Sequence, residues 1–225
     1  MRLSFLSIER AGRAALALGA ILLAATPLRA ATLPATLPPV DQCKGDTGFA
    51  KFRNNLRQMV ARKDKKALLA MLSPRVIVNF GGGTGSKAFL DQWSFDEPDD
   101  PDGIWATLTT MLALGCARDK AVRTIPSIDA QMEPYYDALD DDVGLILPGA
   151  KLYKEAGVEA PNSKTIPWTL AAITSRSGDL FMGVRLPDGR EGLIDEHLLY
   201  EPLGYRLVIE KLRGRWMITA LVAGD

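Results

Sequence analysis

Histidine is the scarcest residue in this chain that could carry chemistry. The sequence has one histidine, His197, and two cysteines, Cys43 and Cys116. A catalytic zinc ion takes several imidazole, thiolate or carboxylate ligands, so this supply argues against a zinc amidase or metallopeptidase. A Ser-His-Asp or Cys-His hydrolase would also have to use His197, which lies in a predicted surface turn. No G-x-S-x-G or S-x-x-K motif occurs. We therefore predict no catalytic residue, no metal site and no cofactor.

The two cysteines are interpreted as a structural pair. Cys43 and Cys116 both lie beyond an apparent export signal at the start of the chain. In an oxidising compartment the simplest arrangement is one disulfide bond between them, closing a loop of roughly 70 residues and contributing on the order of 4 kcal/mol to stability. The alternative is two unpaired thiols in the core.

Glycines and carboxylates are the other residues with spacing that could be functional. The glycine-rich stretch 81–87 lacks the glycine before Lys87 and the hydroxyl after it that a phosphate-binding loop needs, and it predicts a flexible turn. The acidic runs 96–102 and 140–142 lack the ligand spacing of a calcium loop, so we interpret them as solvated loops. A glycosidase that cleaves sugar with a pair of carboxylates is not excluded, because the sequence does not show how far apart two side chains lie.

The first 30 residues have the order of a secretory signal peptide. Three arginines, at positions 2, 10 and 13, accompany an apolar run that closes at Ala30. The run is about 15 residues long, whereas a helix needs roughly 20 to cross a bilayer. We expect cleavage near Ala30 and no stable membrane span afterwards; an uncleaved anchor is the alternative. The proline-rich residues 31–42 then predict an extended, poorly packed leader.

Without this peptide the chain is mildly acidic. It retains 23 basic and 26 acidic residues, which gives a net charge of about minus three. Proteins that bind nucleic acid normally present a basic face to phosphate, so we expect no nucleic-acid partner. Export predicts a periplasmic or secreted protein.

Residues 43–142 combine helical and strand patterns and predict an α+β domain. Apolar residues recur at helical spacing from Phe49 to Val60, and Asp64 can cap a second short helix. A strand is expected at 75–80. Two further helices follow, with Ser86 and Asp102 as the expected N-caps.

Residues 143–202 have the pattern of short strands and turns that predicts a small β-barrel. Short strands are expected at 145–147, 150–153, 170–175, 180–185 and 191–194. Residues 183–194 read GVRLPDGREGLI and are followed by a leucine, Leu198 or Leu199. This basic strand, D-G turn and glycine with a hydrophobic pair resemble a bacterial SH3 domain. The resemblance implies a five-stranded barrel that binds peptides or cell-wall fragments.

Three aromatic residues in this region are candidates for a ligand groove. They are Tyr153, Trp168 and Phe181. The alternative is that all three belong to the core.

The two ends of the mature chain resemble an NTF2-like cone, a fold of helices against a curved sheet. The likeness rests on the helices followed by residues 73–80 and on the strand 214–220. We expect residues 203–225 to form a closing β-hairpin that packs on the N-terminal domain or on the barrel. The barrel is then an insertion before this hairpin, and the fold class is α+β.

Together these features predict a noncatalytic exported envelope protein. Its SH3-like domain would bind a peptide, a cell-wall glycan or a protein partner. The competing hypothesis is a periplasmic enzyme, either with an NTF2-like pocket or with carboxylates that hydrolyse the cell wall. A third is a purely structural partner of another envelope protein.

Overall fold

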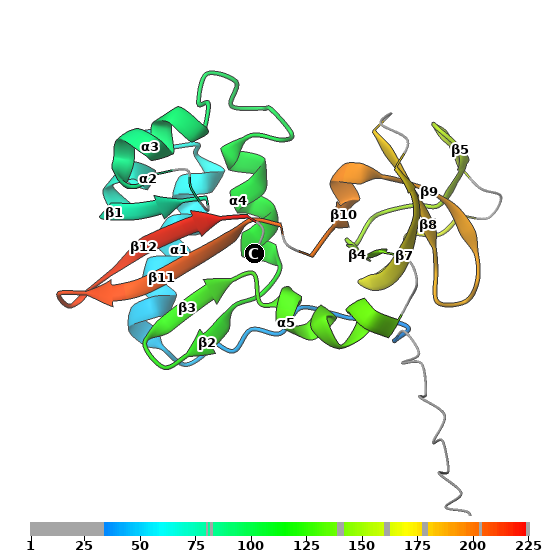
Figure 1. Cartoon of the computed structure of the whole chain (residues 1–225), viewed down its shortest axis with the longest axis horizontal. Coiled ribbons are helices and arrows are strands. Elements are labelled where there is room, and N and C mark those ends of the chain that lie inside the picture. The colour runs from blue at the N-terminus through cyan, green and yellow to red at the C-terminus, as the bar shows by residue number, and fades with distance from the viewer. Residues whose placement is uncertain are drawn as a thin grey trace, which may run out of the picture.

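The chain folds into two units that lie side by side. The computed structural model describes residues 34–79, 81, 83–138, 142–159, 163–176, 180–202 and 204–223; the predicted signal peptide and cleavage site lie outside them. One unit combines helices with a mixed five-stranded sheet, and the other is built on a seven-stranded antiparallel sheet (Figure 1). The α+β class predicted from the sequence is confirmed.

The first two helices of the first unit begin at aspartate side chains that cap them. Asp46 accepts a hydrogen bond from the backbone N–H of Phe49 and caps α1, and Asp64 does the same for α2 through Ala67. The bounds are Thr47–Ala61 for α1, Lys65–Met71 for α2, Gly85–Gln92 for α3 and Ile104–Ala113 for α4. The N-caps expected at Ser86 and Asp102 are wrong, because α3 starts after Thr84 and α4 after Gly103.

The sheet of the first unit joins segments from both ends of the chain. Its order is β1-β12-β11-β3-β2, with β1 parallel to β12 and the other pairs antiparallel. The strands are β1 (Leu72–Val78), β2 (Ala117–Asp119), β3 (Val122–Ile125), β11 (Arg206–Leu212) and β12 (Arg215–Val222). The hairpin β11–β12 therefore lies inside the sheet of the first unit, and the second unit is inserted between β3 and β11.

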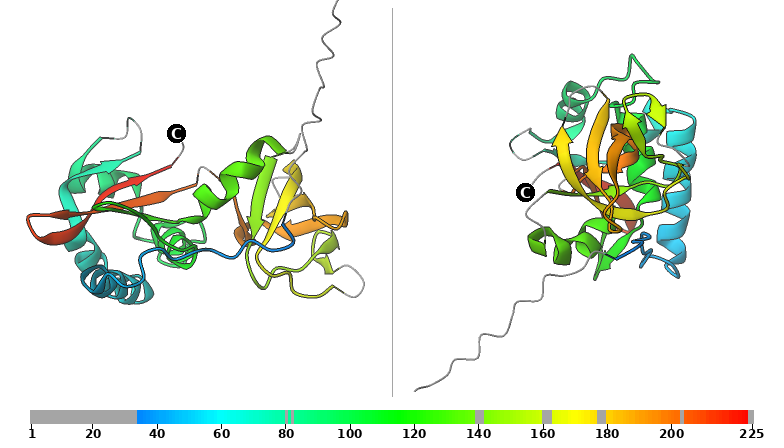
Figure 2. Two further views of the ribbon diagram at one scale, coloured as in Figure 1. Left: turned by 90° about the horizontal axis from the view of Figure 1, so that it is seen from below. Right: turned by 90° about the vertical axis from the view of Figure 1, so that its right-hand side faces the viewer.

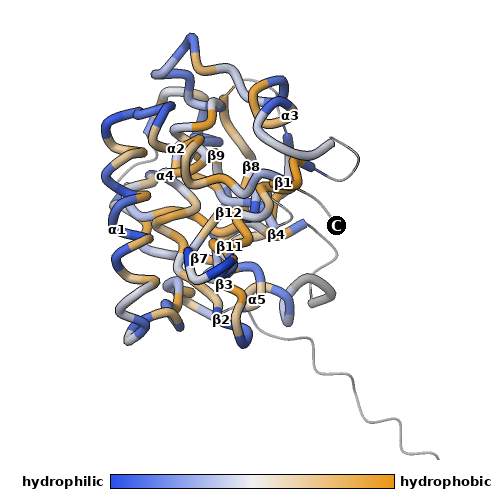
Figure 3. Tube along the Cα trace, turned by 90° about the vertical axis from the view of Figure 1, so that its left-hand side faces the viewer, coloured by the Kyte–Doolittle hydropathy of each residue, from blue (hydrophilic) through white to orange (hydrophobic). Residues whose placement is uncertain are grey.

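Helices α1 and α4 cover one face of this sheet (Figures 1 and 2). Phe49, Leu56 and Leu108 from these helices share a buried core with Ile209 and Ile218 from the strands. The hydropathy along the chain follows this arrangement, with hydrophilic residues along the outer side of α1 (Figure 3). Burial of this apolar face holds the helices on the sheet.

The second unit is a sheet of short antiparallel strands in which β7, β8 and β9 form a meander. The order β10-β4-β7-β8-β9-β5-β6 comprises β4 (Asp142–Ile146), β5 (Tyr153–Glu155), β6 (Val158–Glu159), β7 (Thr169–Arg176), β8 (Phe181–Arg185), β9 (Glu191–Asp195) and β10 (Leu199–Tyr200). The strands curl around their own buried core (Figure 1). No pairing among the described strands joins the edge strands β10 and β6, so the sheet remains open where a closed barrel was expected.

Short helices and a third apolar cluster connect the two units. Helix α5 (Ile128–Met132) and the 3₁₀ helix η1 (Glu133–Ala138) follow β3. Leu114 from the first unit and Ile128 from α5 are buried together with Leu145 and Leu170 from the second sheet. This shared cluster packs the units against each other.

The leader forms a strap across both units rather than a loosely packed segment. In the second unit, the carbonyl of Trp168 accepts a 2.8 Å hydrogen bond from the N–H of Leu37. In the first, the Ser127 hydroxyl donates to the carbonyl of Val40 at 2.5 Å, and the Arg53 guanidinium holds Asp41 at 2.8 Å. Figure 2 shows this strap running beneath both units.

The predicted disulfide bond Cys43–Cys116 is confirmed. Its Cα atoms are 5.7 Å apart, and both residues are fully buried. The bond fixes the end of the strap to the segment that follows α4. Within the described part of the chain, none of the helices combines the length and apolar character needed to cross a membrane.

Candidate functional site

The three aromatic residues predicted as a groove do not come together. Tyr153 and Phe181 form an edge-to-face pair with ring centroids 5.3 Å apart, and both are partly exposed on the second sheet. Trp168 instead packs against the apolar cluster between the units. The structure therefore offers two aromatic rings at one place and uses the third to join the units.

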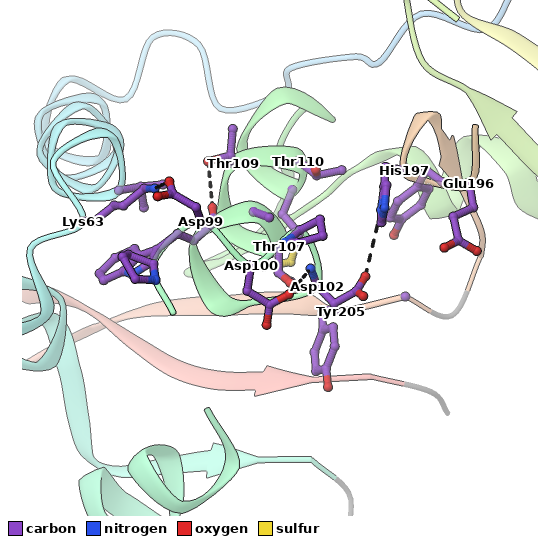
Figure 4. Close-up of a pocket in the computed structure, with 18 of the residues that line it drawn as sticks. Lys63, Asp99, Asp100, Asp102, Thr107, Thr109, Thr110, Glu196, His197 and Tyr205 are labelled. Carbon is purple, nitrogen blue, oxygen red and sulfur yellow. Dashed lines mark hydrogen bonds and ion pairs between the residues drawn. The ribbon is translucent and has the colours of Figure 1, made fainter. Parts of the chain in front are cut away.

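A cleft lies between the two units. Its volume is about 840 Å³, within the usual range for ligand pockets. The first unit contributes the end of α1, the acidic loop 98–102 and α4; the second contributes the turn after β9, the strand β10 and the crossing segment that follows. Figure 4 shows side chains from these segments facing one another. A ligand in this cleft would touch both units.

The wall on the first unit is acidic at its rim and apolar beneath. Asp99 is ion-paired with Lys63, and Asp100 accepts a 3.0 Å hydrogen bond from the backbone N–H of Asp102 (Figure 4). Trp105 and Met111 on α4 are almost fully buried below this rim. Trp105 is held edge-to-face by Phe95, with centroids 5.5 Å apart, so the floor of the cleft is fixed before any ligand arrives.

The wall on the second unit comes from the 3₁₀ turn η2 (Glu196–Leu198), which Asp195 caps by accepting from the N–H of His197. His197 points across the cleft toward Asp102, with 4.0 Å between Nδ1 and Oδ1 (Figure 4). The two side chains are 34% and 84% exposed, and this distance is too long for a hydrogen bond. The histidine is in the turn predicted from the sequence, and the fold brings it to the cleft.

Two of the threonine hydroxyl groups that line the cleft donate hydrogen bonds within their own helix. The Thr107 hydroxyl donates to the carbonyl of Gly103 at 3.0 Å, and the Thr109 hydroxyl donates to that of Trp105 at 2.7 Å. Neither hydroxyl is directed at His197, so these residues do not form a nucleophile and base pair of the kind that acyl transfer requires.

Tyr200 connects the cleft to a partly buried carboxyl group on α5. Its ring lines the cleft, and its hydroxyl donates to Oδ1 of Asp129 on α5 at 2.9 Å. Burial raises the pKa of Asp129, while the Tyr200 hydrogen bond and the charge of Arg206 act in the opposite direction. This contact ties the second unit to the segment that leaves the first.

The described residues also contain one group of side chains with metal-ligand spacing. Asp41, Cys43 and Cys116 offer ligand atoms within 4.8 Å of one another. The two sulfurs are bonded to each other and Asp41 is bound by Arg53, so this group is structural in the oxidised protein.

No protein-family model matches this chain, and no curated protein matches it significantly. The site is therefore interpreted from its own geometry.

Proposed function

We propose that this chain is a noncatalytic exported protein of the cell envelope that binds a cell-wall fragment in the cleft between its two units. The observation that carries the proposal is the cleft itself, because residues of both units line one cavity of about 840 Å³. A smaller groove of about 680 Å³ lies beside the β8–β9 turn, and it is lined mainly by the second unit and by Ala35 of the strap.

The proposed ligand class follows from the architecture of the second unit. We propose that the second unit belongs to the SH3-like class and is inserted into a first unit of the NTF2-like class. Support comes from the meander β7–β8–β9, from the tight turn in which Leu186 N–H donates to the Arg190 carbonyl at 2.8 Å, and from Gly189 at a φ of 84°. The resemblance implies binding of peptides or cell-wall fragments. Export is supported by the disulfide bond, which is typical of oxidising compartments.

The chemistry of the cleft favours binding over catalysis. The two threonine hydroxyls at 107 and 109 donate within α4, and Asp102, the carboxylate that faces the His197 ring across the cleft, is 84% exposed. An acid that protonates a leaving group normally has its pKa raised by burial, which an exposed carboxylate does not provide. The competing enzyme hypothesis would need a carboxyl pair that acts on sugar in the same cleft.

A pull-down on purified peptidoglycan sacculi tests this proposal. We expect the mature protein to sediment with sacculi and to release no soluble muropeptides. Ala106 lines the cleft on α4, so Ala106→Trp should fill the cavity and reduce retention at least tenfold. Ala113 is exposed at the end of the same helix and outside the cleft, and Ala113→Trp is the matched control.

Two results would contradict the proposal. Release of muropeptides would support the enzyme hypothesis. Retention that survives Ala106→Trp but is lost in the double variant Tyr153→Ala, Phe181→Ala would place the ligand on the aromatic pair of the second sheet.

A further inference from the structure

We propose that the cleft recognises the free ammonium group of a short cell-wall peptide, held between Asp102 of the first unit and Glu196 of the second. This inference rests on the proposed function and adds the chemical group by which the ligand is selected.

The charges that line the cleft are strongly one-sided. The carboxylates are Asp99, Asp100, Asp102, Glu196 and Glu201. Among the described lining residues, Lys63 is the one lysine or arginine, and its ammonium group is already paired with Asp99. The cleft therefore carries a net negative charge and complements a cationic ligand.

Not all of these carboxylates are equally available to a ligand. Glu201 lies 2.6 Å from the Arg176 guanidinium, which also contacts Asp142 at 3.1 Å. Asp102 meets only the distant His197 ring in the described structure, and Glu196 belongs to the 3₁₀ turn on the opposite wall. Asp102 and Glu196 thus line the cavity from different units, so an ammonium group bound in it would meet a carboxylate on either wall.

The rest of the cleft suits a peptide better than an isolated cation. A metal ion would need oxygen ligands converging within about 2.6 Å of one point. Here the charged rim adjoins the partly or fully exposed side chains of Pro101, Leu199 and Tyr205, and Tyr205 is held with its ring 4.7 Å from that of Trp93. These apolar surfaces can bury the aliphatic stem of a diamino acid while its ammonium group reaches the carboxylates. Such a group gains both charge-assisted hydrogen bonds and apolar contact.

Sacculi with and without free amines test this inference. Acetic anhydride converts the free amines of cell-wall peptides to uncharged amides and leaves the glycan backbone intact. We expect the full mature protein to be retained at least tenfold less on acetylated than on native sacculi. Raising NaCl to about 1 M, where the screening length falls to about 3 Å, should weaken retention on native sacculi as well.

Matched variants assign the effect to the two carboxylates. The double variant Asp102→Asn, Glu196→Gln should lose roughly tenfold of the retention on native sacculi, in line with the loss of two charge-assisted contacts on an exposed rim. The control Asp91→Asn, Glu155→Gln removes the same number of charges, one from each unit, at exposed positions outside the cleft. It should behave as the wild type. Unchanged thermal unfolding of both variants shows that any loss is not due to misfolding.

The outcomes separate this inference from the proposed function. Equal retention on native and acetylated sacculi, with loss in Ala106→Trp, would overturn recognition of the amine and leave binding in the cleft intact. Loss in the Asp91→Asn, Glu155→Gln control equal to that in the cleft variant would also overturn it, because net charge alone would then explain retention. No retention of the wild type on either matrix would overturn both proposals.

Discussion

Removal of the Cys43–Cys116 disulfide bond should cost this protein much of its stability. The bond joins residues 73 positions apart. For a loop of that size the chain-entropy relation gives about 4 kcal/mol of stabilisation at 25 °C. Single domains are typically stable by only about 5–15 kcal/mol, so the reduced protein should be marginal. The loss also removes the covalent anchor at the end of the strap, which is then held by the Arg53–Asp41 ion pair and by hydrogen bonds at Val40 and Gln42.

Urea unfolding of the mature protein measures this effect. With a slope of about 2 kcal/mol per molar urea, a loss of about 4 kcal/mol moves the midpoint down by about 2 M. The double variant Cys43→Ala, Cys116→Ala should show this shift, and the wild type in excess reductant should show the same one. Addition of reductant to the variant should change nothing, which controls for effects of the reagent.

Two results would show that the disulfide bond does not have this role. A difference below about 1 kcal/mol between oxidised and reduced wild type would show that the bond does not constrain the unfolded chain as calculated. Alkylation of two thiols in the native, unreduced protein would show that the bond is absent.

Two other predictions concern buried charges. Arg123 is 3% exposed, contacts Asp46 at 2.7 Å and lies over the rings of Phe49 and Trp216, so Arg123→Met should cost about 2 kcal/mol in urea unfolding. The Phe49 N–H and Arg123 lower the pKa of Asp46, so wild-type stability should fall as the pH drops below its unfolded value of 3.8, and less so in the variant. Burial raises the pKa of Asp129, so the folded protein loses stability as the pH rises from the unfolded value of 3.8 through the raised folded value. Asp129→Asn keeps an oxygen that accepts the Tyr200 hydrogen bond but carries no charge. It should therefore raise the Tm at pH 7 but not at pH 3. A Tm lowered at pH 7 would contradict this.

Periodic apolar residues made much of the fold predictable. The helix that begins near Phe49 and the strand that contains Val76 and Val78 bury the residues whose spacing predicted them. The short strands β2 and β3 were not predicted, because three or four residues give little periodicity and β3 buries a cation, Arg123. The pairing of β1 with β12 was likewise inaccessible, since it joins opposite ends of the chain.

The proline-rich composition of the leader wrongly predicted a poorly packed segment. Prolines at positions 34, 38 and 39 correctly predicted an extended backbone. Besides the Asp41 side chain, the contacts that anchor it use its own main chain, at Leu37 and Val40, and a backbone group can pair whatever the side chain is. Such pairing leaves no signal in residue types.

The cleft could not be predicted from the sequence either. The acidic loop 96–102 and His197 were each interpreted correctly as surface segments. Nothing in their local sequence indicates that insertion of the second unit brings Asp102 and His197 to within 4.0 Å. A functional surface assembled from two units can be recognised only after both are placed.

Ligand binding in the cleft is tested most directly by mapping amide hydrogen exchange in the mature protein with and without soluble muropeptides. We expect slower exchange in segments 98–111 and 196–205, which line the cleft from the two units, and no change around Tyr153 and Phe181. Protection confined to the strands that carry Tyr153 and Phe181 would contradict it.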